Sequence, residues 1–212
     1  VLDICRAGGA RTVTKGKSMI TEEIALNDHL EKNGIRAVET DLGEYIIQLR
    51  GEHPSHIIAP AVHLNKEQVE SDFRRVHDHL PVARDLSEPE SLLNEARMVL
   101  RKEYVTADVG ITGANFLVAE TGSSIIVTNE GNGDLTQILP KVHVVVASIE
   151  KIVPTLEDAG QILRVLARSA TGQDMSVYTT VSTGPRRKGD PDGPPGYHGV
   201  LLDHGRSSML GT

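Results

Sequence analysis

The chain has 212 residues, of which 39% are hydrophobic and 24% are charged, as is ordinary for a globular protein. Its formal net charge of −7 argues against general nucleic-acid binding, because that function needs a basic face. No run approaches the roughly 18 apolar residues of a membrane span, and no signal-peptide core opens the chain. We therefore expect a cytoplasmic protein with a single domain over residues 1–212.

Cysteine content limits the cofactors that this chain can hold. Cys5 is the only cysteine, so we expect no internal disulfide and no iron–sulfur cluster, which usually takes four thiolates. The chain opens on Val1 and closes on Thr212 without an obvious terminator. We interpret it as a domain excised from a longer protein.

Strands and helices are predicted to alternate along the chain, which is typical of parallel βαβ units. The fold expected from this order is α/β: a three-layer αβα domain with a mixed, largely parallel sheet. Apolar and β-branched runs predict strands at residues 11–14, 37–40, 45–49, 57–59, 116–119, 125–128, 143–148, 177–181 and 200–203.

Capping signals predict the helices between these strands. Thr21 is expected to cap a helix that Gly34 ends. Further helices are expected to run to about residues 80, 104 and 172, opened by Asn65 with Gln68, Ser87 with Glu90, and Thr155 with Asp158. The last of these helices is predicted to face inward through Ile162, Leu163, Val165 and Leu166.

The most informative segment spans residues 110–134. Its two continuous apolar runs, at 116–119 and 125–128, predict buried strands. The first run is followed by Glu120 and the second by Glu130, each with a glycine close behind. Ligands in open α/β sheets bind where strands end in loops, so Glu120 and Glu130 are our candidate catalytic residues. The alternative is that they are solvated acids in two tight turns.

Other acids crowd a strand–loop junction earlier in the chain, where Glu39, Asp41 and Glu44 lie close together in sequence. If the junctions share one edge of the sheet, repulsion and burial would raise at least one carboxyl pKa, as a general acid or base requires. These acids are therefore candidate ligand-binding residues. In the alternative interpretation they only cap helices and pin loops.

Lys15, Lys17 and Ser18 stand between a predicted strand and a predicted helix, and they resemble the end of a phosphate-binding P-loop. The P-loop needs a glycine where this chain has Arg11, so a nucleotide site is not predicted. A site for a small-molecule anion remains possible, with two solvated lysines as the alternative. Small or polar residues beside the glycine turns complete the ligand-binding candidates: Gly113, Asn115, Thr121, Gly122 and Asn132.

Histidine spacing does not predict a metal site. The pairs His53 with His56 and His77 with His79 have no clustered carboxylate or cysteine to complete a tetrahedral set. We assign no metal ligand, and we interpret His143, at the start of a predicted buried strand, as structural.

Four segments, at residues 15–24, 38–49, 56–63 and 110–134, resemble the LUD domain of the lactate-utilisation protein B family. The matches are in order and extend over nearly the whole chain. The resemblance implies a fold like that of the NagB/RpiA/CoA-transferase superfamily and a role in oxidising L-lactate to pyruvate. It also implies a following ferredoxin-like region, so that 4Fe–4S clusters would belong to the full-length protein, and sibling lactate-utilisation proteins as partners.

Two other functions remain open at this point. One is a transferase or isomerase that acts on a CoA ester or a phosphorylated small molecule, for which Glu130 followed by Gly131 is a short match to CoA transferases. The other is a non-catalytic assembly domain. The resemblance implies an oxidoreductase component, and because no dinucleotide fingerprint follows a predicted strand, we expect this component to be inactive alone.

Overall fold

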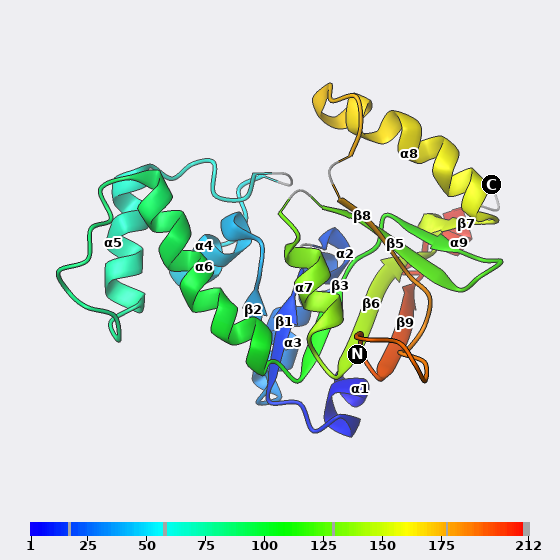
Figure 1. Cartoon of the computed structure of the whole chain (residues 1–212), viewed down its shortest axis with the longest axis horizontal. Helices are drawn as coiled ribbons and strands as arrows, with labels where there is room; N and C mark the ends of the chain where they lie inside the picture. Colours follow the sequence, from blue (N-terminus) through cyan, green and yellow to red (C-terminus); the bar gives the residue numbers. More distant parts are fainter. Residues whose placement is uncertain (17, 57–58, 129, 177, 210–212) are drawn as a thin grey trace.

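The computed structural model describes residues 1–16, 18–56, 59–128, 130–176 and 178–209. Its main sheet, called sheet A here, has the strand order β2-β1-β3-β6-β9, and every neighbouring pair is parallel (Figure 1). The strands of sheet A are β1 (Thr12–Lys15), β2 (Arg36–Glu39), β3 (Val109–Thr112), β6 (Val142–Ser148) and β9 (Gly196–Leu202).

A smaller sheet, sheet B, has the order β7-β4-β5-β8 and is mostly antiparallel. Its strands are β4 (Phe116–Val118), β5 (Ser123–Thr128), β7 (Ile152–Val153) and β8 (Tyr178–Ser182). Helix α8 (Leu156–Thr171) packs on this sheet, where Ala159 joins a small core with Phe116, Val118 and Ile125.

Helices cover both faces of sheet A, and β2 shows why. Ala37 faces a core shared with Leu30 of α3, whereas the next residue, Val38, faces a second core that contains Tyr45 of α4. Successive side chains of a strand point to opposite faces, so both faces of this strand are buried. The helices around sheet A are α1 (Leu2–Ala7), α2 (Met19–Glu23), α3 (Leu26–Lys32), α4 (Leu42–Arg50), α5 (Lys66–Val76), α6 (Pro89–Thr106) and α7 (Asn132–Ile138).

The second core, which contains Val38 and Tyr45, continues into a lobe of helices that extends to one side of the molecule (Figure 1). Phe73 of α5 and Ala96 of α6 are nearly inaccessible to solvent in it. The 3-10 helix η1 (Ile149–Lys151) follows β6 directly, and α9 (Arg206–Met209) follows β9 and packs near η1. In the part of the chain that the structure describes, we find no helix with the length and apolar character needed to cross a bilayer.

The predicted α/β fold, with a largely parallel sheet flanked by helices, is confirmed. The strand predicted at residues 45–49 is wrong, because α4 occupies this segment. The Asp41 side chain accepts hydrogen bonds from the backbone N–H groups of Gly43 and Glu44, which caps a helix, and Gly51 ends it with φ 67°. In the strand predicted at 57–59, residues 57 and 58 lie outside the described residues and Ala59 is not in a strand.

Helix starts were predicted with mixed success. The capping boxes at Asn65 and Thr155 are confirmed. Thr21 is not a cap but a buried residue within α2, whose N-cap is Ser18. Helix α6 begins after Glu88 with a proline in its first turn, so the box predicted from Ser87 is wrong.

The inward face of α8 differs from the prediction. Its inward row runs through the buried Ala159 and Ala167 and the partly buried Leu163, which are spaced four residues apart and therefore share one side of the helix. Ile162 is 43% exposed and Val165 is 58% exposed. The predicted burial of these two residues is therefore wrong.

Candidate functional site

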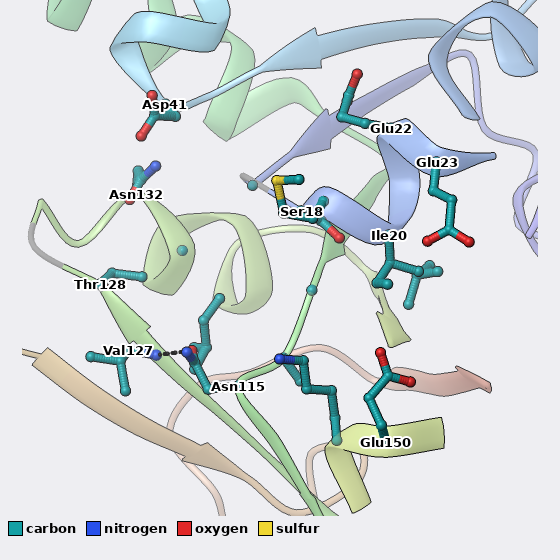
Figure 2. A pocket seen from close by; sticks show the side chains of 18 of the residues that line it. Ser18, Ile20, Glu22, Glu23, Asp41, Asn115, Val127, Thr128, Asn132 and Glu150 are labelled. Atoms are coloured by element: carbon teal, nitrogen blue, oxygen red, sulfur yellow. Dashed lines mark hydrogen bonds between the residues drawn. The ribbon is translucent and has the colours of Figure 1, made fainter. Parts of the chain in front are cut away.

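A pocket of about 870 Å³ lies where the strands of sheet A end (Figure 2). Gly16 follows β1, Asp41 comes two residues after β2, and Gly113 follows β3. The carboxyl ends of parallel strands are where open α/β sheets place ligands, as the sequence predicted. Of the candidate site residues, the structure brings Ser18, Asp41, Gly113, Asn115, Glu130 and Asn132 into the lining.

Asn115 is held rigidly at the base of this pocket. Its backbone N–H donates to the Ile125 carbonyl at 2.8 Å, and its side-chain Oδ1 accepts from the Val127 N–H at 2.8 Å (Figure 2). Because the amide oxygen is used, the two hydrogens on Nδ2 point elsewhere. They have no partner among the described residues and are the donors that Asn115 can offer a ligand.

Ser18 and Gly113, which both line the pocket, lie very close to each other. A β-carbon added at Gly113 would lie 2.9 Å from the Ser18 hydroxyl oxygen, so this close approach requires glycine. Ser18 is only 8% exposed and begins α2. On the other side of the pocket Asn132 begins α7 and lies near Asp41 (Figure 2).

The pocket is predominantly acidic. Arg206 is already paired, with Glu23 at 2.7 Å and with Glu150 at 2.9 Å. Lys151 has no ion pair with any residue that the structure describes. The charged lining residues are Glu22, Glu23, Asp41, Glu130, Glu150, Lys151 and Arg206. A bound anion would therefore rely on Lys151 or on an added cation.

Lys15 does not line the pocket but lies buried beside it, with 1% of its surface exposed. Its ammonium contacts Glu22 at 2.5 Å, Glu39 at 2.8 Å and Thr21 Oγ1 at 3.0 Å, which uses all three of its protons. Burial disfavours the charged form, but attraction to Glu39 and Glu22 outweighs it and raises the pKa of Lys15. Lys15 therefore does not line the pocket as predicted, and Lys17 lies outside the described residues.

Glu39 and Glu44 are also buried beside the pocket and are not part of its lining. Burial raises the pKa of Glu39, although Lys15 opposes the shift. Burial, followed by repulsion from Glu39 and Glu22, raises the pKa of Glu44 to about 7. The crowding of acids at this junction thus perturbs a carboxyl group, as expected, but behind the pocket wall.

Glu120, Thr121 and Gly122 lie elsewhere, in the turn between β4 and β5. The expectation that Glu120 lies at the ligand site is wrong: it does not line the pocket, it is exposed, and its Oε1 accepts the backbone N–H of Leu156 at 2.7 Å, in the first turn of α8. Thr121 Oγ1 lies 2.7 Å from the Ser123 hydroxyl. The reason is that β4 runs antiparallel to β5: the carboxyl end of β5 leads to Glu130 at the pocket, so the carboxyl end of β4 points the other way.

Several lining residues were missed by the sequence reasoning. Glu150 and Lys151 follow β6 directly, and the rule that ligands bind where strands end could have found them, because a strand was predicted at residues 143–148. Arg206 follows β9 and reaches the same pocket from the far end of the chain. No signal in the sequence pairs Arg206 with Glu23, which is 183 positions away.

Together, the fold and the pocket define an α/β domain with an acidic cavity at the carboxyl edge of a parallel sheet. The chain belongs to the LUD domain family, whose model matches residues 1–202. It is 51% identical over 204 residues to "Lactate utilization protein B" of Geobacillus sp. (strain WCH70), covering 96% of this chain and 42% of that protein. It is 46% identical over 213 residues to the protein of the same name from Bacillus subtilis (strain 168), covering 100% of this chain and 44% of that protein.

The chain therefore spans less than half the length of these curated relatives. Among solved structures, it matches a DUF162 family protein from Deinococcus radiodurans with a TM-score of 0.39 and 19% identity. That match covers 94% of this chain and 92% of the other.

Proposed function

We propose that this chain is a component of an L-lactate-oxidising system that converts lactate to pyruvate. The observation that supports this most strongly is 46–51% identity, over nearly the whole chain, to proteins named lactate utilization protein B. In this proposal the electrons leave through 4Fe–4S clusters carried by other parts of the full-length protein or by sibling lactate-utilisation proteins.

The residues of this chain do not fit such a cluster. A 4Fe–4S cluster usually takes four thiolates, whereas Cys5 is the only cysteine and is fully buried. Burial also raises the pKa of its thiol, which disfavours the thiolate that a metal needs. The contribution of this chain would therefore be a binding pocket rather than electron transfer.

The pocket offers groups that suit a small 2-hydroxy acid. The Lys151 ammonium can face a carboxylate, and the Asn115 amide hydrogens can donate to a hydroxyl or keto oxygen. Glu130 lines the same pocket and is our candidate to accept the proton of the hydroxyl group. A carboxylate within reach of that proton is what general-base catalysis requires.

Domain replacement tests this proposal. We would substitute this chain for the matching segment of lactate utilization protein B in Bacillus subtilis (strain 168) and measure growth on L-lactate as the sole carbon source. We expect the hybrid to support growth, Lys151→Met to reduce it, and Lys32→Met, which removes an exposed lysine of α3, to leave it unchanged. A stable, full-length hybrid that fails to grow, or equal growth of both variants, would contradict the proposal.

A non-catalytic assembly role is the second candidate, and one observation favours it. Ile162 and Val165 of α8 are 43% and 58% exposed, and Val181 of β8 is 48% exposed, so large apolar side chains are available for contact with a partner. If assembly is the role, Val165→Asp in the hybrid should abolish growth while Lys151→Met does not. The two variants therefore separate the two functions.

A further inference from the structure

Three carboxylates converge behind the wall of the pocket. Glu22 of α2, Glu39 at the end of β2 and Glu44 of α4 each present an oxygen, and these oxygens lie within 4.8 Å of one another. Glu39 and Glu44 are buried, so water screens their repulsion poorly. A cluster of this kind needs a compensating positive charge.

Lys15 compensates only part of this charge. Its ammonium contacts the Oε1 atoms of Glu22 and Glu39 and gives its remaining proton to Thr21. The Glu44 carboxylate has neither a hydrogen bond nor an ion pair with any described residue. Three carboxylates and one ammonium leave a formal excess of two negative charges.

Two buried oxygen atoms in this cluster and beside it accept no hydrogen bond from any described residue. Glu39 is 3% exposed, and its Oε2 has no hydrogen-bond partner among the described residues. The same holds for Oδ1 of Asn27, whose Nδ2 donates to Glu39 Oε1 at 2.6 Å. The amide cannot be turned around, because its oxygen would then face the carboxylate. Orphaned buried acceptors are costly, so both oxygens indicate a missing donor or cation.

We propose that Glu22, Glu39 and Glu44 bind one hard divalent cation of the Mg²⁺, Mn²⁺ or Ca²⁺ class. Carboxylate oxygens are the ligands that these ions prefer. Metal–oxygen distances of about 2.0–2.6 Å separate opposite ligands by about 4.0–5.2 Å, which agrees with the spacing of the cluster. A charge of +2 also balances the formal excess left by Lys15.

The cation would lie on the side of the carboxylates away from Lys15. Lys15 contacts Oε1 of Glu22 and Oε1 of Glu39, which leaves the other oxygen of each group free for the metal. Glu22 is 39% exposed and also lines the large pocket, so it provides the route by which an ion enters. Three carboxylates do not fill the six or more positions of such an ion, and water or a pocket ligand would take the rest.

Manganese binding tests this site directly. We would treat the purified chain with a chelator, remove the chelator, and titrate Mn²⁺ while following the free-ion signal by electron paramagnetic resonance. We expect one site per chain with a Kd on the order of 10⁻⁵ to 10⁻³ M, displaced by excess Mg²⁺ or Ca²⁺. Glu44→Gln should weaken binding at least tenfold.

The control is Glu67→Gln, which removes the same charge from an exposed position of α5 and should leave binding unchanged. Mn²⁺ should also raise the Tm of the wild-type chain and of Glu67→Gln, but not that of Glu44→Gln. The proposal is overturned if the folded wild-type chain binds no Mn²⁺. That result would mean that protonation of a carboxylate, rather than a metal ion, reduces the negative charge of the cluster. Equal binding by the wild-type and Glu44→Gln proteins would overturn it as well.

Discussion

Gly110 of β3 lies against the backbone carbonyl of Thr136 in α7, so closely that an added β-carbon would come within 1.7 Å of the Thr136 oxygen. This contact holds α7 against sheet A. It therefore fixes the position of Asn132, the first residue of α7, at the pocket. A side chain of any kind at position 110 would have to displace the helix or the strand.

Gly110→Ala should therefore destabilise the protein strongly. Backbone atoms cannot step aside as the tip of a flexible side chain can, so we expect a loss of about 3 kcal/mol, the upper end of ordinary overpacking. Each 1 kcal/mol corresponds to about 2–4 °C in Tm for a chain of this size. Gly199→Ala in β9 is the matched control, because nothing lies within 4 Å of its added β-carbon. Similar melting temperatures for the two variants would show that the contact is not tight.

Glu120 should behave as a helix-capping residue. Glu120→Ala removes the acceptor for the Leu156 N–H and should cost about 1 kcal/mol, as loss of a cap typically does. Because Glu120 does not line the pocket, growth of the Bacillus hybrid on L-lactate should be unaffected. Glu130→Gln, in the pocket, should reduce growth with little change in Tm. If Glu120→Ala abolished growth without changing the Tm, Glu120 would have a functional role rather than a capping role.

His143 should make the fold sensitive to mild acid. Burial holds the pKa of His143 at about 4, and its Nε2 lies 2.8 Å from the Thr112 hydroxyl. The unfolded chain takes up this proton near the ordinary value of about 6.5, before the folded chain does. The free energy of unfolding should therefore fall as the pH drops from about 6.5 to 4.

His143→Gln removes this titration and keeps a polar group beside Thr112. Denaturant unfolding between pH 7 and pH 4 should show a smaller loss of stability for this variant than for the wild-type chain. His29→Gln, at an exposed position of α3, should leave the slope unchanged. Parallel curves for wild type and His143→Gln would contradict the assignment.

The purified chain should not oxidise lactate with soluble dye acceptors. Removing two electrons needs an acceptor group, and this sequence has one cysteine and no dinucleotide fingerprint. The measurement is dye reduction with L-lactate by the cofactor-free chain, with the complete Bacillus system as positive control. Steady turnover by the chain alone would be decisive against this expectation.

Much of the site was predictable because sheet A follows simple rules. The apolar run of β6 marks a buried parallel strand, and the polar residue Asn115 beside a glycine turn was correctly expected at the site, although the strand before it, β3, was not predicted. Glu120 could not be placed in the same way. It also follows a short apolar run, and nothing local reveals that β4 runs antiparallel to β5, which turns the carboxyl end of β4 away from the pocket.

The helix α4 illustrates a second limit. Tyr45, Ile46, Ile47 and Leu49 are four apolar residues in a span of five, which fits a buried strand as well as a buried helix. The signals that distinguish them are at the ends, Asp41 as N-cap and Gly51 as terminator. The ion pairs of Lys15 were not predictable, because they depend on how closely α2 and β2 approach β1.

Any shortened version of this chain needs to keep the late strand β9. It pairs with β6 along its whole length, from Gly196 beside Val142 to Leu202 beside Ser148. Tyr197 of β9 also donates a hydrogen bond to the Ser124 hydroxyl at 3.0 Å, which ties it to sheet B. A version cut before Gly196 would lack β9 and expose the edge of the apolar strand β6, and such edges aggregate. An affinity tag or a fluorescent label is better inserted in the exposed turn at residues 188–192, which leaves the strand pairing of both sheets intact.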